Sequence, residues 1–167
     1  MTLIDDIQTC KNIGKKGALI SLDIRKAFDT ISHSYINLAY KFFNFGDNII
    51  KWLNLLGTHR RACVIIEDDL NTNFFDLERG NAQGDTTSPY IFNIGYQILL
   101  LKLNFDLQIE GLIPPLEVPP DLATPQLQVN YGRKALAYAD DANVLTSLCP
   151  DSIGRIKVIL KEFGTLS

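Results

Sequence analysis

The segment ALAYADDANVL, residues 135–145, places two adjacent carboxylates inside an otherwise apolar run. Strand-favouring side chains such as Tyr138 and Val144 flank the pair, so the segment predicts a β-hairpin with Asp140 and Asp141 at its turn. Aspartate also tolerates turn geometry and caps its own backbone, so a purely structural turn explains the segment equally well. Other segments of the chain are needed to decide whether the two aspartates form a structural turn or a functional site.

Length and composition are those of a globular protein. The 167 residues make one domain or a large piece of one, with 46% apolar and 21% charged residues. The net charge of −3 argues mildly against a free-standing nucleic-acid binder, which is usually basic. The longest apolar region, residues 90–105, is too short and too often interrupted by polar residues to span a bilayer.

The cysteines and the N-terminus bear on the compartment. Cys10, Cys63 and Cys149 lie far apart, with neither the paired spacing of a zinc site nor a dense disulfide framework, so we expect buried thiols in a reducing environment. The first residues lack a basic start followed by an apolar run, so a secretory signal is not expected. We therefore expect an intracellular protein of the nucleus or cytoplasm, without a membrane partner.

Apolar periodicity and turn residues predict strands mixed with helices. The first half of the chain is predicted to form a helix from Leu3 to near Gly14, a buried strand at 17–23, a helix from Ser32 or Ser34 to about Phe43, and a helix at 47–57 in which Trp52 is a core anchor. A hairpin follows, with strands at 62–67 and 73–78 joined through 68–71. The second half is predicted to form a buried helix beginning at Ser88, the hairpin around Asp140 and Asp141, and a helix from Asp151 to Phe163. His33 is expected to be structural and His59 to lie on the surface. Residues 111–134 are rich in proline and predict an insertion loop. This order of elements predicts an α+β fold with a mainly antiparallel sheet packed against helices.

The first of two further segments with chemical potential is SLDIRKAFDTISH, residues 21–33. Asp23 closes the predicted strand, and Phe28 follows five residues later as the chain turns towards a helix. A helix cap and a core aromatic are the structural alternatives for these residues.

The second segment is RGNAQGDTTSPYIFN, residues 79–93. Gly80 and Gly84 would let the backbone come close to another molecule. Between them, Gln83 offers both a donor and an acceptor to a base or sugar edge. A glycine turn before a helix explains the segment equally well.

Pairing of the opening hairpin beside the strand at 17–23 would bring Asp23 and Asp140 together, although 117 positions separate them. Two carboxylates about 4 Å apart repel by roughly 4 kcal/mol at a surface-like effective dielectric constant. Cations must therefore neutralise such a cluster. Carboxylate oxygens suit Mg²⁺, whose remaining coordination positions can be filled by the phosphates of a substrate. Two such ions can activate a hydroxyl and stabilise a leaving pyrophosphate.

Taken together, LDIRKAFD, RGNAQGDTTSP and YADD resemble motifs A, B and C of reverse transcriptases, most closely those of non-LTR (LINE-type) retrotransposons. The resemblance covers the chain from about Leu3 to Ser167. It departs from the family at Thr86-Thr87, where Pro-Leu is usual.

The resemblance implies a role for each matching residue. Asp23 and Asp140, with Asp141 beside them, would be catalytic and bind two Mg²⁺ ions (or Mn²⁺), with the Ile24 carbonyl as a further ligand. Phe28 would be a steric gate that favours deoxynucleotides. The substrate-binding set would comprise Ile24, the backbone amides of Arg25, Lys26 and Ala27 facing the triphosphate, Phe28, and Gln83 and Gly84 at the nascent base pair and template.

The resemblance also implies a polymerase palm. We expect residues 1–167 to form a partial reverse transcriptase domain, with incomplete fingers and no thumb. Its partners would be an RNA template, a DNA primer, deoxynucleoside triphosphates, and the fingers and thumb segments of a full-length protein. A non-catalytic retroelement relic and a metal-dependent interaction module remain the alternatives.

Overall fold

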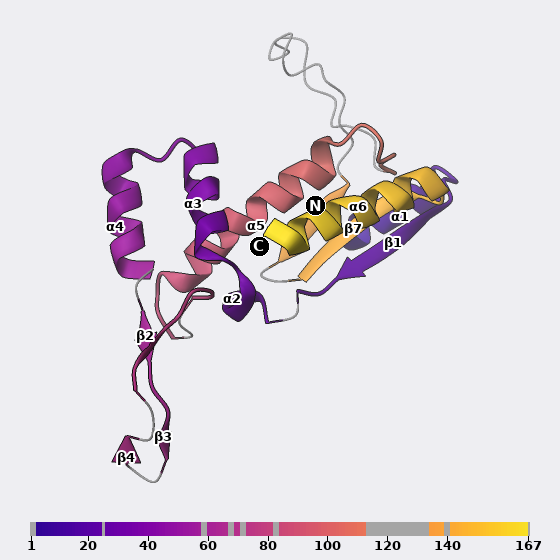
Figure 1. The fold of residues 1–167 in the computed structure, drawn as a ribbon. Helices are drawn as coiled ribbons and strands as arrows, with labels where there is room; N and C mark the ends of the chain where they lie inside the picture. Colours follow the sequence, from indigo (N-terminus) through magenta and orange to yellow (C-terminus); the bar gives the residue numbers. More distant parts are fainter. Residues whose placement is uncertain are drawn as a thin grey trace. The chain divides into compact units, whose positions relative to one another are not determined.

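The computed structural model describes residues 3–24, 26–57, 60–66, 69–70, 73–81, 84–112, 134–138 and 141–166. Most of the predicted proline-rich loop therefore lies outside the described residues, as does His59. The chain divides into two compact units, one formed by residues 1–24 and 99–164 and the other by residues 25–98 and 165–167. We describe each unit by itself (Figure 1).

The first unit contains a three-stranded sheet in the order β1-β7-β6. Strand β1 (Gly17–Leu22) pairs antiparallel with β7 (Asp141–Ser147), which pairs antiparallel with β6 (Ala135–Tyr138). Both the opening hairpin and its pairing with the early strand are confirmed. The predicted turn position of Asp141 is wrong, because Asp141 is the first residue of β7 and pairs with Tyr138. The prediction of a buried early strand is wrong, because β1 lies at the sheet's edge among the described strands and its residues alternate between exposed and half-buried.

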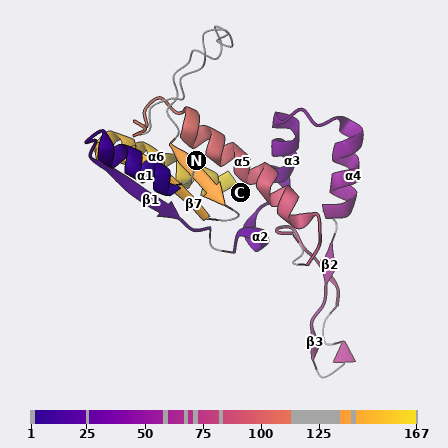
Figure 2. The same cartoon turned by 180° about the vertical axis from the view of Figure 1, so that it is seen from behind.

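Helices α1 (Leu3–Asn12) and α6 (Pro150–Leu166) pack on this sheet. Figure 1 shows α6 in front of the strands and Figure 2, from behind, shows α1 in front of them. Cys10 of α1 forms a buried cluster with Leu112 and with Leu145 of β7, while Ile156 and Ile159 of α6 are buried almost completely. The sheet is therefore covered by a helix on each face.

The C-terminal end of α5 (Ser88–Phe105) holds the start of β6. The Asn104 carboxamide oxygen accepts from the amides of Lys134 (2.9 Å) and Ala135 (3.0 Å), and its NH₂ group donates to the Ala135 carbonyl (3.2 Å). Just after the helix, Asp106 accepts a hydrogen bond from Arg155 of α6 at 2.8 Å. Burial raises the pKa of Asp106, but the hydrogen bonds from Arg155 and the Gln108 amide outweigh it and lower that pKa overall.

The second unit contains α2 (Ala27–Thr30), α3 (His33–Phe42), α4 (Asp47–Gly57) and the first part of α5. Helix α3 begins at the predicted cap, because the Ser32 hydroxyl accepts from the Tyr35 amide at 3.2 Å. The Tyr35 hydroxyl in turn donates to the Gly95 carbonyl of α5 at 3.0 Å, and its pKa is raised to about 12 by burial. These contacts fix α3 against α5.

Trp52 is not a core anchor, because its side chain is 65% exposed. It lies on the outer face of α4 with Ile49 and Leu56, three and four positions away, which are also exposed. Ile50 is the buried apolar side chain of this helix. Apolar side chains of α4 therefore lie on its exposed face as well as on its buried face.

The hairpin between α4 and α5 consists of two short ladders. Strand β2 (Arg61–Ala62) pairs with β5 (Phe75–Asp76), and β3 (Ile65–Ile66) pairs with β4 (Asp69–Leu70). The predicted hairpin is confirmed, but the predicted turn is wrong because Asp69 and Leu70 are in a strand. Helices with antiparallel strands fit the predicted α+β class. None of the helices in the described ranges is long and apolar enough to cross a membrane.

Candidate active site

The strand pairing of the first unit brings the acidic ends of β1 and β7 together. Leu22, the last residue of β1, pairs with Ala142 in an antiparallel register. Asp23 follows β1 directly and Asp141 is the first residue of β7, so a register continued one step beyond the observed ladder would set these residues opposite each other. Ile24, whose carbonyl is the predicted further ligand, follows Asp23 in the sequence. Directly opposed residues of an antiparallel pair have Cβ atoms roughly 4.5–5.5 Å apart.

The same register gives an expectation for the face of the sheet to which each carboxylate points. The Ser21 hydroxyl donates to the Asn143 side-chain oxygen at 2.8 Å, so these paired residues point to the same side. Side chains two positions apart on a strand share a face, which puts Asp141 of β7 on the face of Asn143. The same face, that of Ser21, is the expectation for Asp23, which directly follows the last residue of β1. Both aspartates are exposed.

Asp140, the third predicted carboxylate, lies outside the described residues. No group of three His, Cys, Asp or Glu side chains that could hold a metal ion occurs in the described part of the chain. The donor set there, two exposed carboxylates at the adjoining ends of β1 and β7, fits a hard divalent cation that retains open positions. The three-carboxylate site stays a prediction.

The predicted nucleotide-contacting residues 25–28 enter α2 through an unusual backbone conformation. Lys26 has φ 54° and ψ 48°, the left-handed region, and its carbonyl accepts from the amides of Asp29 (2.8 Å) and Thr30 (3.1 Å). Such a conformation is uncommon for a residue with a side chain. Arg25 lies outside the described residues, and the expected contacts of these amides with a triphosphate stay a prediction.

Phe28, the predicted steric gate, is half-buried in the second unit. Its ring packs on Phe92 of α5 with 5.2 Å between centroids and 42° between ring planes, and Phe92 stacks on Tyr96 at 5.3 Å. Tilted and offset pairs at this separation are favourable aromatic contacts. The ring is therefore anchored on one side by an aromatic row along α5.

Gly80 makes a close contact, but with its own chain. Its φ is +82°, and a Cβ there would lie 2.8 Å from the Asp29 carbonyl oxygen. The Gly80 amide donates to the Ile31 carbonyl at 2.8 Å, and the Asn81 amide donates to the Phe28 carbonyl at 2.6 Å. The expectation that this glycine admits another molecule is wrong, because the space is filled by the segment that carries Phe28.

Gly84 differs from Gly80. It has φ +89° and is exposed, and no heavy atom of the described residues lies within 4 Å of where its Cβ would be. The glycine is thus favoured by its backbone angle, and none of the described residues fills the space beside it. Gln83 lies outside the described residues.

The sequence reasoning missed Asp85. Its carboxylate binds Arg60 at 2.6 Å and accepts hydrogen bonds from the amide (2.9 Å) and hydroxyl (2.8 Å) of Thr87. These bonds, the Thr87 amide first, lower the pKa of Asp85. The signal was an Asp two residues before a Thr ahead of a helix, a pattern that predicts a local side-chain-to-backbone turn. The pair fixes the entry to α5.

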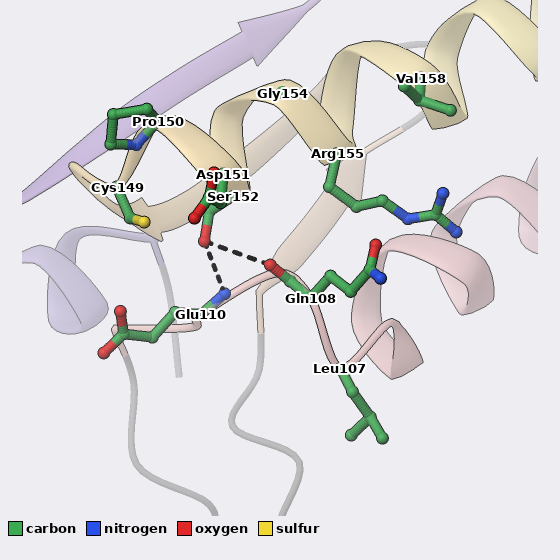
Figure 3. A pocket seen from close by; sticks show the side chains of 10 residues that line it. All are labelled: Leu107, Gln108, Glu110, Cys149, Pro150, Asp151, Ser152, Gly154, Arg155 and Val158. Atoms are coloured by element: carbon green, nitrogen blue, oxygen red, sulfur yellow. Dashed lines mark hydrogen bonds between the residues drawn. The ribbon is translucent and has the colours of Figure 1, made fainter.

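The first unit also contains a pocket of about 780 Å³ (Figure 3). It is lined mainly by the segment 107–110 and the first turns of α6. The Ser152 hydroxyl accepts from the Glu110 amide at 3.0 Å and donates to the Gln108 carbonyl at 3.4 Å. None of the predicted site residues lines this pocket.

Comparison with known proteins agrees with the motifs. Residues 1–165 match the family described as reverse transcriptase (RNA-dependent DNA polymerase). Two proteins of Popillia japonica, each named Retrovirus-related Pol polyprotein from type-1 retrotransposable element R2, are 33% identical over 132 residues and 29% identical over 127 residues. The matches cover 79% and 76% of this chain but 19% and 16% of those proteins.

The chain thus spans about a fifth of the length of the curated relatives that it matches. Their retrotransposon origin confirms the resemblance to the reverse transcriptases of non-LTR elements. The family match extends over nearly the whole chain and includes the segments of all three motifs. The chain therefore belongs to the reverse transcriptase family of RNA-dependent DNA polymerases.

Proposed function

We propose that this chain provides the palm of an RNA-directed DNA polymerase that adds deoxynucleotides to a primer 3′-hydroxyl on an RNA template. The observation that carries the proposal is the register of β1 and β7, in which Leu22 pairs with Ala142 and Ser21 bonds Asn143. From that register, Asp23 and Asp141 are expected at the same end and on the same face of the sheet. Two strands remote in sequence thereby present acidic residues to one site.

The charge at this end of the sheet supports a metal-dependent reaction. Asp23 and Asp141 would face each other at the end of the β1–β7 ladder, and Asp140 would add a third negative charge to them. We propose that these carboxylates and the Ile24 carbonyl would hold two Mg²⁺ ions. When bound, the ions would supply positive charge that acidifies the primer hydroxyl and stabilises the leaving pyrophosphate.

The chain's other residues would bind and select the nucleotide. The amides of residues 25–27 would face the triphosphate, where backbone N–H groups are suitable donors to phosphate oxygens. Phe28, anchored on Phe92, would exclude the 2′-hydroxyl of a ribonucleotide. Gln83 and Gly84 would line the nascent base pair, and the open space beside Gly84 leaves room for a close approach.

Primer extension tests the proposal directly. The chain, joined to the fingers and thumb segments of a full-length relative, is incubated with an RNA template, an annealed DNA primer, deoxynucleoside triphosphates and Mg²⁺. We expect extension by the wild type and a loss of about a hundredfold or more in Asp23→Asn, because a ligand of the catalytic ions is removed. Asp76→Asn is the matched control, since Asp76 is also an exposed carboxylate at a strand but lies outside the predicted site.

The outcomes separate the alternatives. Equal activity of Asp23→Asn and Asp76→Asn contradicts the assignment of the carboxylates. A wild type that extends no primer, yet binds a deoxynucleotide in a Mg²⁺-dependent manner, corresponds to the non-catalytic relic. Absence of both extension and Mg²⁺-dependent nucleotide binding corresponds to the interaction module.

A further inference from the structure

A histidine at the start of α3 reaches the segment that carries Gly80. The Nε2 atom of His33 lies 2.9 Å from the Gly80 carbonyl oxygen in a partly buried contact. A carbonyl oxygen only accepts, so Nε2 carries the proton and donates. This is a side-chain bond between residues 47 positions apart in sequence.

The same two segments are joined by main-chain contacts. The amides of Gly80 and Asn81 donate to the carbonyls of Ile31 and Phe28, and Ser32 forms a β-bridge with Arg79. Residues 79–81 therefore run against residues 28–32. The His33 side chain holds the Gly80 carbonyl and the Ile31 carbonyl accepts from the Gly80 amide, so the peptide groups before and after Gly80 are both hydrogen-bonded.

This arrangement bears on Phe28 because the Asn81 amide bonds the Phe28 carbonyl at 2.6 Å. The ring of Phe28 is held by Phe92, and its main chain is held by residues 79–81. Asn81 is only 5% exposed, so water competes little for these contacts. A shift of the Gly80 carbonyl would move the Asn81 amide and, with it, the main chain of Phe28.

We propose that His33 is a positioning residue for sugar selection: its bond to Gly80 fixes residues 79–81 on α2 and thereby sets the place of Phe28. The proposal rests on the proposed polymerase function and on the gate role of Phe28. His33 does not touch the nucleotide. It acts through Gly80 and Asn81, and its removal loosens discrimination between deoxynucleotides and ribonucleotides before it abolishes extension.

The test compares variants of the chain, joined to fingers and thumb segments as in the primer-extension test, by the ratio of deoxynucleotide to ribonucleotide incorporation efficiency. His33→Ala removes the donor, His33→Phe removes it while keeping an aromatic ring, and His33→Gln retains an N–H donor of similar reach. We expect the ratio to fall by about three- to tenfold in the first two, the range that one neutral hydrogen bond corresponds to. His33→Gln should restore most of it.

Tyr35→Phe is the matched control. It removes another buried side-chain bond between α3 and a carbonyl of the same unit, that of Gly95, without touching residues 79–81. Its ratio should equal that of the wild type even where its thermal stability falls. Hydrogen exchange of the Gly80 and Asn81 amides should accelerate in His33→Phe and stay slow in Tyr35→Phe.

The double variant of His33→Phe with Phe28→Ala tests whether His33 acts through Phe28. Phe28→Ala alone should lower the ratio strongly, and adding His33→Phe should lower it no further, because the positioned ring is already gone. A wild-type ratio in His33→Phe, or additive losses in the double variant, overturns the positioning role while leaving the polymerase intact. A wild type that extends no primer overturns the proposed function and the positioning role together.

Discussion

At residue 80 a side chain would meet two obstacles at once. The backbone has φ +82°, and the Asp29 carbonyl oxygen lies 2.8 Å from the position of a Cβ. The left-handed region is unfavourable for residues other than glycine. Because the nearby atoms belong to main chain held by hydrogen bonds, they cannot move aside cheaply.

We therefore expect Gly80→Ala to lower the free energy of unfolding by about 2–4 kcal/mol, from backbone strain and overpacking combined. Gly154→Ala is the matched control, since Gly154 lies within α6 with no described heavy atom within 4 Å of a Cβ. Alanine should stabilise that helix by about 0.5–1 kcal/mol. Urea unfolding of both variants measures the difference, and equal effects would contradict the close contact at Gly80.

The lowered pKa of Asp85 makes the stability of the fold depend on pH. Its pKa is lowered below the ordinary value of 3.8, by hydrogen bonds from Thr87 and the pairing with Arg60. A carboxyl whose folded-state pKa is depressed stabilises the fold above its unfolded pKa and loses that contribution as pH falls through the folded value. The affected range therefore begins near 3.8 and extends below it.

Asp85→Asn should remove this part of the acid sensitivity. The wild type is expected to lose stability more steeply than the variant as pH falls below about 4, because the variant has no carboxylate to protonate. Thermal unfolding across a pH series gives both slopes. Parallel curves for the two proteins would mean that the Arg60 and Thr87 contacts do not persist in solution.

At the scale of elements, regular patterns and the pairing of the main strands were predictable, while the other long-range contacts were not. The run at 17–22 and the hairpin at 135–147 carry apolar strand residues around turn signals, so the strands and their pairing could be predicted from the sequence. Helix α3 followed from the serine at its N-cap. The site's carboxylates were found through motif spacing, and their role remains a prediction.

Other features depend on tertiary contacts that leave no local pattern. Helix α2 is four residues long and follows a left-handed Lys26, and neither property has a sequence signature here. The Asn104 contacts join residues 30 and 31 positions apart. Trp52 was misassigned because apolar periodicity marks a helix but does not say which apolar side chains are covered.

The hydrogen bonds of Asn104 predict how much the attachment of β6 to the end of α5 contributes to stability. Its side chain makes three hydrogen bonds to the start of β6, so Asn104→Ala should lower the free energy of unfolding by about 1–3 kcal/mol. Asn104→Asp should lose less, because a carboxylate still accepts from the Lys134 and Ala135 amides. Asn12→Ala, which removes an exposed side-chain bond to Gln8, is the control and should change little. Chemical unfolding ranks the three, and an Asp variant as unstable as the Ala variant would contradict the acceptor role.

At the scale of the whole molecule, apolar surface is unevenly covered. The outer face of α4 exposes Ile49 (52%), Trp52 (65%) and Leu56 (53%). Apolar side chains gathered on one exposed face promote association with other surfaces. A polar substitution there should therefore affect self-association more than folding.

We expect Trp52→Gln to change the free energy of unfolding by less than about 0.5 kcal/mol and to reduce self-association at high protein concentration. Ile50→Gln, on the buried side of the same helix, should lower stability by about 2 kcal/mol or more. Unfolding is followed by circular dichroism, because Trp52 is the chain's only tryptophan. Sedimentation velocity measures association, and a large loss of stability in Trp52→Gln would show that the ring is covered in solution.

The ladder between β1 and β7 joins Gly17 to Ser147 and Leu22 to Ala142, partners whose synthesis on the ribosome is widely separated in time. At about 5–20 residues per second, β1 emerges roughly 6–25 s before its partner strand has been made. During that interval its main-chain groups have no native partner and are open to wrong pairings with other nascent chains. Production of this protein should therefore respond to translation speed and to chaperones that shield newly made strands.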